Sequence, residues 1–439
     1  MARASLLAAA AVAVFALAAP AASRQAETRA KLTRDWAYAL AIQRDGKLVV
    51  AGRSVGGGWR FALARYTTRG RLDPSFGRGG GILTALGSSS YASALAIQRD
   101  GKLVAAGRTY VGGLDQDFAV ARYTPRGRLD TTFGRAGVVQ TSFSARPKTS
   151  DEASAVALQR DGKVVVAGLT GRILSGFYRF ALARYTARGT LETSFGRGGK
   201  VLTRFGSNGI ALAVAIQRDG RIVAAGYGRS SFALARYTAR GRLDRSFGQG
   251  GTIVTKLGPS SIANAVAIQP DGKLVAVGVA NFSDFGLARY TARGALDQSF
   301  GDGGKVVTNI GLTGPGEERH PSEDRALAVA IQRDGKLVVA GSSDALAIEG
   351  EKGCCVQDFA LARYTPDGDL DPSFGDAGIV LTHFAGISYA EGVVIQADGK
   401  IVAAGGGAGS FVLARYTATG KLDPTFSRGG KVMTRLRRP

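Results

Sequence analysis

Short apolar runs recur along this chain in one fixed order, seven times over. Each copy begins with two apolar runs, such as "AVAIQ" and "KLVVAG", on either side of a turn that contains Asp-Gly. Asp-Gly between such runs is a strong signal for a β-hairpin. These turns occur at Asp45, Asp100, Asp161, Asp219, Asp271, Asp334 and Asp398.

The second half of each copy predicts two further strands. "FALARYT" or a close relative alternates between two faces, as a strand does, and a short apolar run such as "KVVT" at 305–308 follows later. Between them, "LDPSFG" predicts a capped single turn, because Asp stands before Pro. No segment keeps a helical period over three turns, so the chain is predicted to contain only strands and turns.

Four antiparallel strands repeated at a regular spacing predict an all-β fold, a seven-bladed β-propeller of four-stranded antiparallel blades over residues 37–434. A blade has two apolar faces, and only neighbouring blades can bury both. An open β-solenoid would have much shorter coils, and no linker divides the chain into two barrels. Both alternatives are therefore disfavoured.

The repeated motifs resemble a known family. "IQxDGKxVVAG", "FALARYTxxGxLDxSFGxGG" and the terminal "VxT" are similar to the delta-60 repeat, a bacterial repeat assigned to β-propellers and common in exported and cell-surface proteins. The resemblance covers about residues 37–434 and implies a secreted propeller. It supplies no catalytic residues, because that family has no agreed activity.

The order of motifs predicts how the ring closes. No clear "GGKVVT" run stands before the first copy, in the lead at 24–36, and the last copy ends with "GGKVMT" before a short tail at 435–439. The long connection from "FALARYT" to "KVVT" is expected to cross from one blade to the next. On this interpretation residues 431–434 form the inner strand of blade one, and the C-terminal strand closes the ring.

The N-terminus predicts export. Residues 1–23 combine Arg3, an apolar stretch from Leu6 to Leu17 and the small-residue site "APA", as a secretory signal does. The stretch is short for a membrane anchor and rich in Ala. We therefore expect a secreted or cell-surface protein that meets a membrane only through an uncleaved signal.

The formal net charge of +23 bears on partners and not on the fold. Outside a cell, wall polymers, phospholipid headgroups and nucleic acid are anionic. The alternative is compositional, since scattered Arg on a solvated surface needs no ligand. The expected partner is a cell-surface glycan or protein, nucleic acid is not expected, and a monomer is predicted.

Successive strands place alternate connections on opposite faces of a propeller. The Asp-Gly turns and the "GxLDxSFG" crossings share one face and hardly vary, whereas the connections on the other face vary greatly. Blade six has the two longest, at 309–325 and 342–358. These two connections either form a binding site on a rigid scaffold or are surface insertions that cost the fold little stability. Their candidate binding residues are Glu317, Glu318, His320, Glu323, Asp324, Glu349, Glu351, Cys354, Cys355 and Asp358.

Each copy also contains one Arg in "ARYT" and one acid in "LD". A repeated structural ion pair is the favoured interpretation, because a scaffold needs seven sets and a site needs one. The alternative is a ring of Arg that binds an anion. The Arg residues are Arg65, Arg122, Arg184, Arg236, Arg289, Arg363 and Arg415, and the acids are Asp73, Asp130, Glu192, Asp244, Asp297, Asp371 and Asp423.

The sequence gives little support for a metal site or for a catalytic nucleophile. The two histidines, His320 and His383, belong to different blades, and no G-x-S-x-G or Walker loop is present. "DGDLD" at 367–371 resembles the start of a calcium loop, but it lacks the Gly and Glu that complete one. The adjacent cysteines are either a strained disulfide or two free thiols. No catalytic, metal or cofactor residue is predicted.

These observations predict a binding or scaffolding role at the cell surface, with an unknown ligand. One alternative is a propeller hydrolase or lyase acting on a carbohydrate or lactone. The scarcity of His disfavours it, because such enzymes gather His, Asp or Glu near the ring axis. The other alternative is a purely structural extracellular repeat protein.

Overall fold

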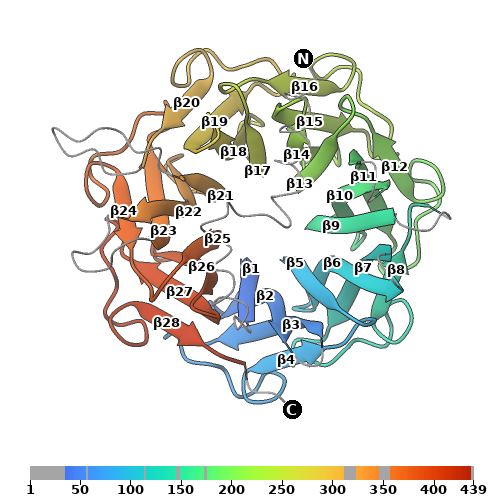
Figure 1. The fold of residues 1–439 in the computed structure, drawn as a ribbon, viewed down its shortest axis with the longest axis horizontal. Coiled ribbons are helices and arrows are strands. Elements are labelled where there is room, and N and C mark those ends of the chain that lie inside the picture. The colour runs from blue at the N-terminus through green and yellow to red at the C-terminus, as the bar shows by residue number, and fades with distance from the viewer. Residues whose placement is uncertain are drawn as a thin grey trace.

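The computed structural model describes residues 35–55, 58–112, 115–144, 149–172, 176–310, 323–345 and 356–436. The strands in these ranges form seven four-stranded blades around a central axis, and no helix is present among the described residues (Figure 1). The prediction of an all-β, seven-bladed propeller is confirmed. The predicted signal at 1–23 and most of the lead at 24–36 lie outside these ranges. Within them, no helix could cross a membrane.

Each blade is continuous in sequence, and its first strand lies nearest the axis (Figure 1). The inner strands are β1 (Asp35–Ile42), β5 (Ser90–Ile97), β9 (Thr149–Leu158), β13 (Gly209–Ile216), β17 (Ile262–Ile268), β21 (Arg325–Ile331) and β25 (Ser388–Ile395). The second strands are β2 (Leu48–Val55), β6 (Leu103–Gly112), β10 (Val164–Arg172), β14 (Ile222–Gly228), β18 (Leu274–Ala280), β22 (Leu337–Ala345) and β26 (Ile401–Gly407). The predicted Asp-Gly turn joins the two strands of each pair.

The "FALARYT" motif forms the third strand and the "KVVT" motif the outermost strand. The third strands are β3 (Trp59–Tyr66), β7 (Asp115–Tyr123), β11 (Phe177–Tyr185), β15 (Ser231–Tyr237), β19 (Asp284–Tyr290), β23 (Val356–Tyr364) and β27 (Ser410–Tyr416). The outer strands are β4 (Gly81–Thr84), β8 (Val138–Thr141), β12 (Lys200–Thr203), β16 (Thr252–Thr255), β20 (Lys305–Thr308), β24 (Ile379–Thr382) and β28 (Lys431–Thr434). Ladder pairs such as Phe61↔Thr84 fix this order.

The prediction that the C-terminal strand closes the ring is wrong. β28 pairs with β27 of its own blade, with Phe411 opposite Thr434, and not with a strand of blade one. The physical reason lies in the crossing, whose fourteen or so residues fold back compactly and do not span two blades. In blade one, Tyr66 bridges Leu72, and Arg78 bridges Gly81, so the crossing returns to its own sheet.

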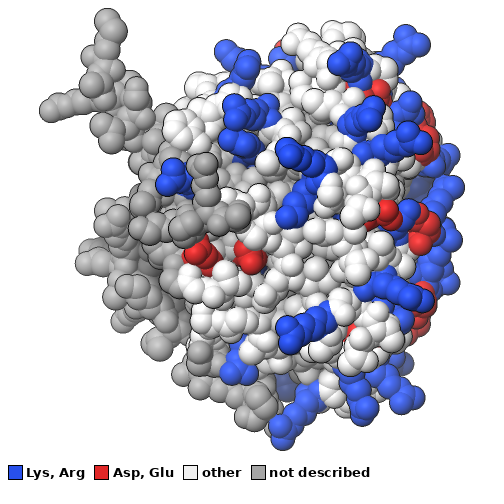
Figure 2. All heavy atoms as spheres, turned by 90° about the vertical axis from the view of Figure 1, so that its right-hand side faces the viewer, with Lys and Arg blue, Asp and Glu red and all other residues white. Residues whose placement is uncertain are grey.

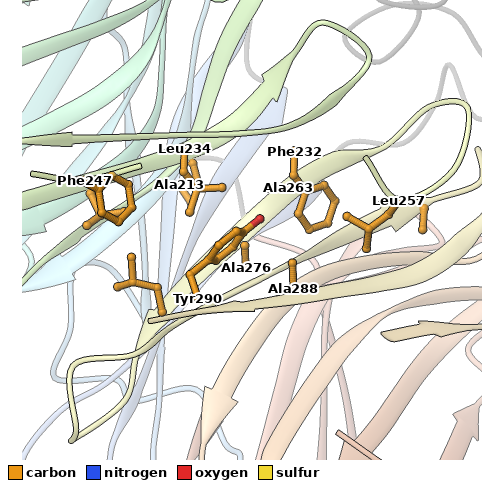
Figure 3. Close-up of a cluster of buried hydrophobic side chains, with 13 residues drawn as sticks. Ala213, Phe232, Leu234, Phe247, Leu257, Ala263, Ala276, Ala288 and Tyr290 are labelled. Carbon is orange, nitrogen blue, oxygen red and sulfur yellow. The ribbon is translucent and has the colours of Figure 1, made fainter. Parts of the chain in front are cut away.

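Apolar clusters between neighbouring blades hold the ring together. Between blades four and five, Phe232, Leu234 and Phe247 meet Leu257 and Tyr290 (Figure 3). Burying side chains of this size stabilises the fold by about 1.5–3 kcal/mol each. Equivalent clusters fill the remaining interfaces, including the one between blades seven and one.

The two faces of the ring are named here by their connections. The constant face contains the Asp-Gly turns and the crossings, which are 43–47 and 67–80 in blade one. The variable face contains the other connections, such as 85–89 in that blade. Lys47 of the turn contacts Asp73 of the crossing at 3.0 Å, so these two connections share one face as predicted.

Candidate functional site

A β-bulge interrupts every inner strand close to the variable face. In β1, Ala37 pairs with Gly52 and Ala39 with Ala51, so Tyr38 is an extra residue without a ladder partner. The same shift occurs in the other six blades. A bulge re-aims the side chain that it carries. The ring therefore presents one extra side chain per blade near the axis.

The glycine of "VVAG" is what permits the bulge. A Cβ at Gly52 would lie only 1.9 Å from the carbonyl oxygen of Trp36, and a Cβ at Gly107 would lie as close to that of Tyr91. Any other residue would push the inner strand away from the second strand. The constant glycine in the motif therefore maintains the bulge, while the residue on the bulge is free to differ.

The bulge residues and their neighbours differ from blade to blade. The extra residues are Tyr38, Ser93, Ser154, Leu212, Asn264, Leu327 and Glu391. Two positions earlier on each inner strand stand Trp36, Tyr91, Glu152, Ile210, Ile262, Arg325 and Tyr389. Blades four and five are apolar at the earlier position, whereas the five remaining blades have aromatic or charged residues there.

Aromatic, arginine and glutamate side chains from these positions contact one another across blade boundaries. We call this group the axis cluster. It consists of Trp36, Tyr38, Arg53, Tyr91, Arg108, Glu152, Tyr389 and Glu391. All of them except buried Arg108 are partly exposed, so most of the group is accessible to solvent.

One half of the axis cluster joins blade seven to blade one. Trp36 donates its indole N–H to Glu391 at 3.3 Å, and its ring lies 5.6 Å from that of Tyr389. Gly406 makes room for it, because a Cβ there would lie 2.1 Å from the indole. Burial raises the pKa of Glu391 to about 7, although the Trp36 hydrogen bond and the charges of Arg325 and Arg53 act to lower it.

The other half joins blades one, two and three. Tyr38 and Tyr91 have ring centroids 5.6 Å apart, and the Tyr91 hydroxyl donates to Glu152 at 2.9 Å. Arg108 pairs with the same carboxylate at 2.5 Å and lies 4.5 Å over the Tyr91 ring. Arg53 lies over Tyr38 in the same way, at 5.7 Å. These contacts fix two guanidinium groups and one carboxylate among aromatic faces.

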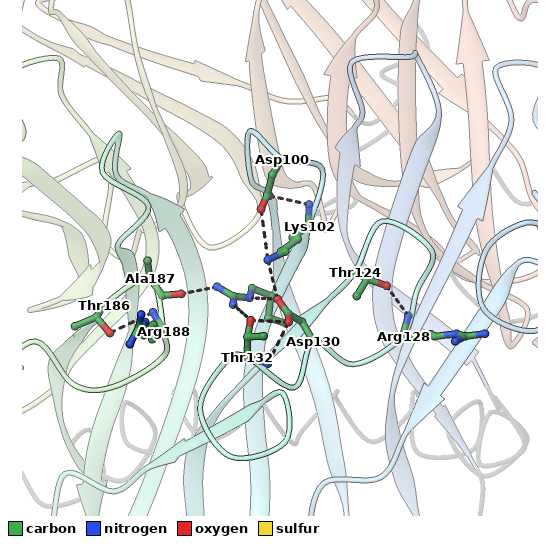
Figure 4. Close-up of polar contacts among 10 residues, drawn as sticks. Asp100, Lys102, Thr124, Arg128, Asp130, Thr132, Thr186, Ala187 and Arg188 are labelled. Carbon is green, nitrogen blue, oxygen red and sulfur yellow. Dashed lines mark hydrogen bonds and ion pairs between the residues drawn. The ribbon is translucent and has the colours of Figure 1, made fainter.

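The predicted Arg and acid motifs come together on the constant face, far from the axis cluster. In blade two, Arg122 Nε contacts Asp130 at 2.8 Å and Lys102 reaches the same carboxylate at 3.1 Å (Figure 4). The guanidinium also lies 4.6 Å over the Phe133 ring. Burial acts to raise the pKa of Asp130, but bonds from Thr132 and Lys102 outweigh it and lower that pKa to about 2.

Each of these arginines also reaches into the next blade. Arg122 donates to the carbonyl of Ala187 in blade three (Figure 4). Arg415 of blade seven donates to Thr68 of blade one at 2.6 Å, so the set runs completely around the ring. The other bonds are Arg65 to Pro125, Arg184 to Ala239, Arg236 to Ala292, Arg289 to Pro366 and Arg363 to Ala418.

These bonds connect each ARYT arginine to the backbone of the following blade. Their guanidinium groups are buried, each is bonded to a carbonyl of the next blade and lies over an aromatic ring, and six of them also contact an acid, which leaves little capacity for an anion. Six blades have the Arg–Asp ion pair. Blade three differs: Glu192 is reached by Lys163 at 3.6 Å, and Arg184 acts on it only through its charge.

Three of the candidate binding residues of blade six lie in the described part of the chain, and each of them contacts another residue of the protein. Asp324 is fully buried and accepts the backbone N–H of Ile310 at 2.6 Å. Asp358 is buried and contacts His383 at 2.9 Å, while Glu323 pairs with Arg325 at 3.0 Å. Seven further candidates lie outside the described residues, namely Glu317, Glu318, His320, Glu349, Glu351, Cys354 and Cys355.

No metal centre is evident in the described part of the chain, where no three His, Cys, Asp or Glu side chains gather closely enough to hold an ion. In "DGDLD", Asp371 is taken up by Arg363 and Lys336, whereas Asp367 and Asp369 are exposed. The three carboxylates are therefore not aimed at a common point.

The sequence interpretation did not identify the axis cluster. A signal for it was present, because the seven copies of "xAxA" in the inner strands keep Ala and vary strongly on either side of it, as "WAYA", "YASA" and "YAEG" show. Without the bulge, residues two apart on a strand would be expected to share one buried face. The bulge shifts this register and places both residues close to the axis.

Comparison with solved structures finds a similar architecture. A protein from Lactobacillus plantarum matches 89% of this chain and 99% of its own, at 14% identity and a TM-score of 0.50. A gluconolactonase from Xanthomonas campestris has 11% identity over 70% of this chain and 84% of its own, with a TM-score of 0.38. An endo-arabinanase from Bacillus licheniformis has 13% identity over 63% and 94%, with a TM-score of 0.36.

Sequence comparison gives one family and no characterised relative. The profile of a family described as "Domain of unknown function (DUF5122) beta-propeller" matches residues 43–76, 98–133, 159–195, 217–247, 269–300, 356–374 and 396–426, together half of the chain. No curated protein matches the sequence. Six of these segments run from the Asp-Gly turn through the second and third strands into the crossing, and the segment 356–374 contains only the third strand and part of the crossing of blade six.

Proposed function

The chain belongs to this β-propeller family of unknown function, and we propose that it is a binding protein that holds a sugar chain in the axis cluster. The observation that carries the proposal is the chemistry of that cluster. Partly exposed indole and phenol rings lie beside fixed carboxylate and guanidinium groups. Rings of this kind cover apolar C–H faces, and the charged groups exchange hydrogen bonds with hydroxyls.

The asymmetry of the ring supports a ligand site over a purely structural cluster. A structural device in a repeat protein is expected in every repeat, as the ARYT arginines are. At the position of Trp36, blades four and five have Ile210 and Ile262 instead. At this position the aromatic and charged residues are thus restricted to blades six, seven, one, two and three, and one side of the axis would hold the ligand.

We place this activity outside the cell or at its surface. The signal-like residues 1–23 and the resemblance of the motifs to the delta-60 repeat support this location. A sugar chain of the cell surface or of the surroundings would be the ligand there.

The test is a glycan array followed by calorimetric titration of the oligosaccharides that bind. Trp36→Ala removes an aromatic face from the cluster and is expected to weaken binding at least about tenfold, since a stacked aromatic contact contributes on the order of 1.4 kcal/mol. Ile210→Ala is the matched control, because it changes the same repeat position in blade four. Equal binding by both variants, or no glycan binding by the native protein, would refute the proposal.

A second function, glycoside or lactone hydrolysis, is favoured by one observation. Glu391 has a pKa of about 7, which suits a general acid at neutral pH. Turnover of nitrophenyl glycosides that is abolished by Glu391→Gln would establish it. Binding without turnover leaves the protein a binding protein.

A further inference from the structure

Exposed arginines gather on the constant face. In blade two they are Arg99 in the Asp-Gly turn and Arg126, Arg128 and Arg135 in the crossing, all with exposed side chains. Figure 2 shows Lys and Arg crowded along the right-hand edge of the molecule, where this face is seen from the side. These arginines are distinct from the buried ARYT arginines described above.

The exposed arginines occupy one part of the ring. Blades one to four have Arg at nearly all of these four repeat positions, and the exceptions are Thr190 and Gln249. Blade five has Pro270, Ala295 and Asp302 there and keeps one Arg. Blade six keeps Arg333 in its turn, and blade seven has Lys421 and Arg428. The charge is therefore densest along an arc of four consecutive blades, and the repeat itself does not impose it. We call this surface the cationic arc.

Blade six reverses the charge on the same backbone. Its crossing has Asp367, Asp369 and Asp376 where blade two has Arg126, Arg128 and Arg135. Both blades have Pro at the preceding position, and Ala136 and Ala377 adopt the same left-handed conformation, with φ of 53° and 46°. The backbone thus accepts either charge, so the arginines of blade two are not needed for folding.

The side chains of the cationic arc are uncompensated. Among the described residues, none of the four exposed arginines of blade two forms an ion pair, because the acids nearby are taken: Asp100 and Asp130 both contact Lys102. The backbone beneath them is held firmly, since the carbonyl of Arg126 accepts the N–H of Gly77 from blade one at 2.9 Å. Fixed backbones that display free guanidinium groups suit an anionic partner.

The shape of the charge pattern selects the kind of partner. A flat membrane would meet the turns of all seven blades together, including the aspartates of blade six, which anionic headgroups repel. A linear polymer can follow blades one to four and leave the others. Within the described residues, the constant face of these four blades has no exposed aromatic side chain on which a nucleobase could stack. The partner is therefore expected to be recognised by its phosphates alone.

We propose that the cationic arc binds a linear phosphate polymer. Arginine forms bidentate hydrogen bonds with phosphate oxygens, and several such contacts in a row hold a chain without reading a sequence. This site lies on the opposite face from the axis cluster. This proposal does not depend on sugar binding at the axis cluster.

The test uses long-chain inorganic polyphosphate with a fluorescent label, and fluorescence polarisation as the readout. The triple variant Arg126→Asp, Arg128→Asp and Arg135→Asp gives blade two the charges of blade six. It is expected to bind at least about tenfold more weakly, and the salt slope of log K is expected to fall by about 2, since each phosphate contact contributes about 0.7. Its thermal melt should match that of the native protein.

The matched control is Arg179→Asp, Arg204→Asp and Lys256→Asp, which makes the same change of net charge with exposed residues of the variable face. It should retain most of the binding. The reverse variant Asp367→Arg, Asp369→Arg and Asp376→Arg removes the opposing charge of blade six from the constant face and should bind more tightly. Equal loss in both triple variants would reduce the effect to net charge and overturn the proposal.

Two further probes distinguish other anionic partners. Vesicles that contain phosphatidylglycerol should compete only weakly with polyphosphate, and single-stranded DNA should bind no more tightly than polyphosphate of equal charge. Stronger binding to either, lost in the blade-two variant, would assign the cationic arc to a membrane or to nucleic acid instead. Failure of polyphosphate to bind at physiological salt would also overturn the proposal.

Discussion

The two faces of this propeller use the repeat in opposite ways. On the constant face, an ARYT arginine bonds to the following blade in every copy, from Arg65 to Arg415. On the variable face, the bulge displays a different residue in each blade, from Tyr38 to Glu391. This difference indicates that residues identical in every copy are the ones that hold neighbouring blades together. A constant backbone with changing side chains marks where a ligand is to be sought.

The largest expected effect comes from breaking the constant-face contact. Arg122→Ala should lower the free energy of unfolding by about 3 kcal/mol, because it leaves the buried carboxylate of Asp130 without its closest ion-pair partner and the Ala187 carbonyl without a donor. Chemical denaturation followed by fluorescence measures the change. Sugar binding at the axis cluster should persist in the folded variant. Arg128→Ala, an exposed neighbour, should change stability by less than about 0.5 kcal/mol.

An intermediate effect is expected at Glu391, and it depends on pH. Because burial raises the pKa of Glu391 from 4.5 to about 7, the folded protein binds its proton more tightly than the unfolded chain does. The contribution of Glu391 to stability is therefore greatest at low pH and is lost as the pH rises through about 7, by at most about 3 kcal/mol. Thermal melts between pH 5 and 8 should show this fall in the native protein and a flatter profile in Glu391→Gln.

The pH window separates this effect from the constant face. Asp130 has a lowered pKa of about 2, so its contribution is lost only when the pH falls well below 4. Parallel profiles for the native protein and Glu391→Gln between pH 5 and 8 would show that the axis carboxylate does not titrate in this range.

The smallest expected effect is at Lys102, which contacts the same carboxylate as Arg122. Its side chain is 30% exposed, and its Nζ lies 3.1 Å from Asp130. Lys102→Ala should cost only about 0.5 kcal/mol, and added salt should reduce that cost further, since exposed ion pairs are screened. A loss as large as that of Arg122→Ala would mean that the burial of the arginine is not what gives the pair its strength.

Most of the fold could be predicted from the sequence because a short local motif identifies each strand. Asp-Gly marks the hairpins, and alternation in "FALARYT" marks the third strand. The blade to which the C-terminal strand belongs could not be predicted, because in a circular repeat the same order of motifs fits a strand of the last blade and a strand of the first blade. Only the pairing of Phe411 with Thr434 decides that "KVMT" belongs to the blade that precedes it. That pairing depends on a crossing whose compact return no local motif reveals.

The candidate sites also differ in how far they could be predicted from the sequence. The Arg and acid of six blades could be paired from the sequence, since both recur in step, whereas in blade three Glu192 is contacted by Lys163 instead. The axis cluster needed three-dimensional information. Trp36 meets Glu391 from the opposite end of the chain, and Tyr91 meets Glu152 from another blade. No spacing rule joins such residues, because closure of the ring and seven bulges bring them together.

Ring closure without a shared strand has a consequence for the history and engineering of this molecule. Because each blade is continuous in sequence, the junction between blades seven and one is made by the same arginine bond as the other six. New termini placed in any variable-face connection would leave every sheet intact. Circular permutation should therefore be tolerated. Duplication or loss of a whole repeat would alter the number of blades without requiring a new way to seal the ring.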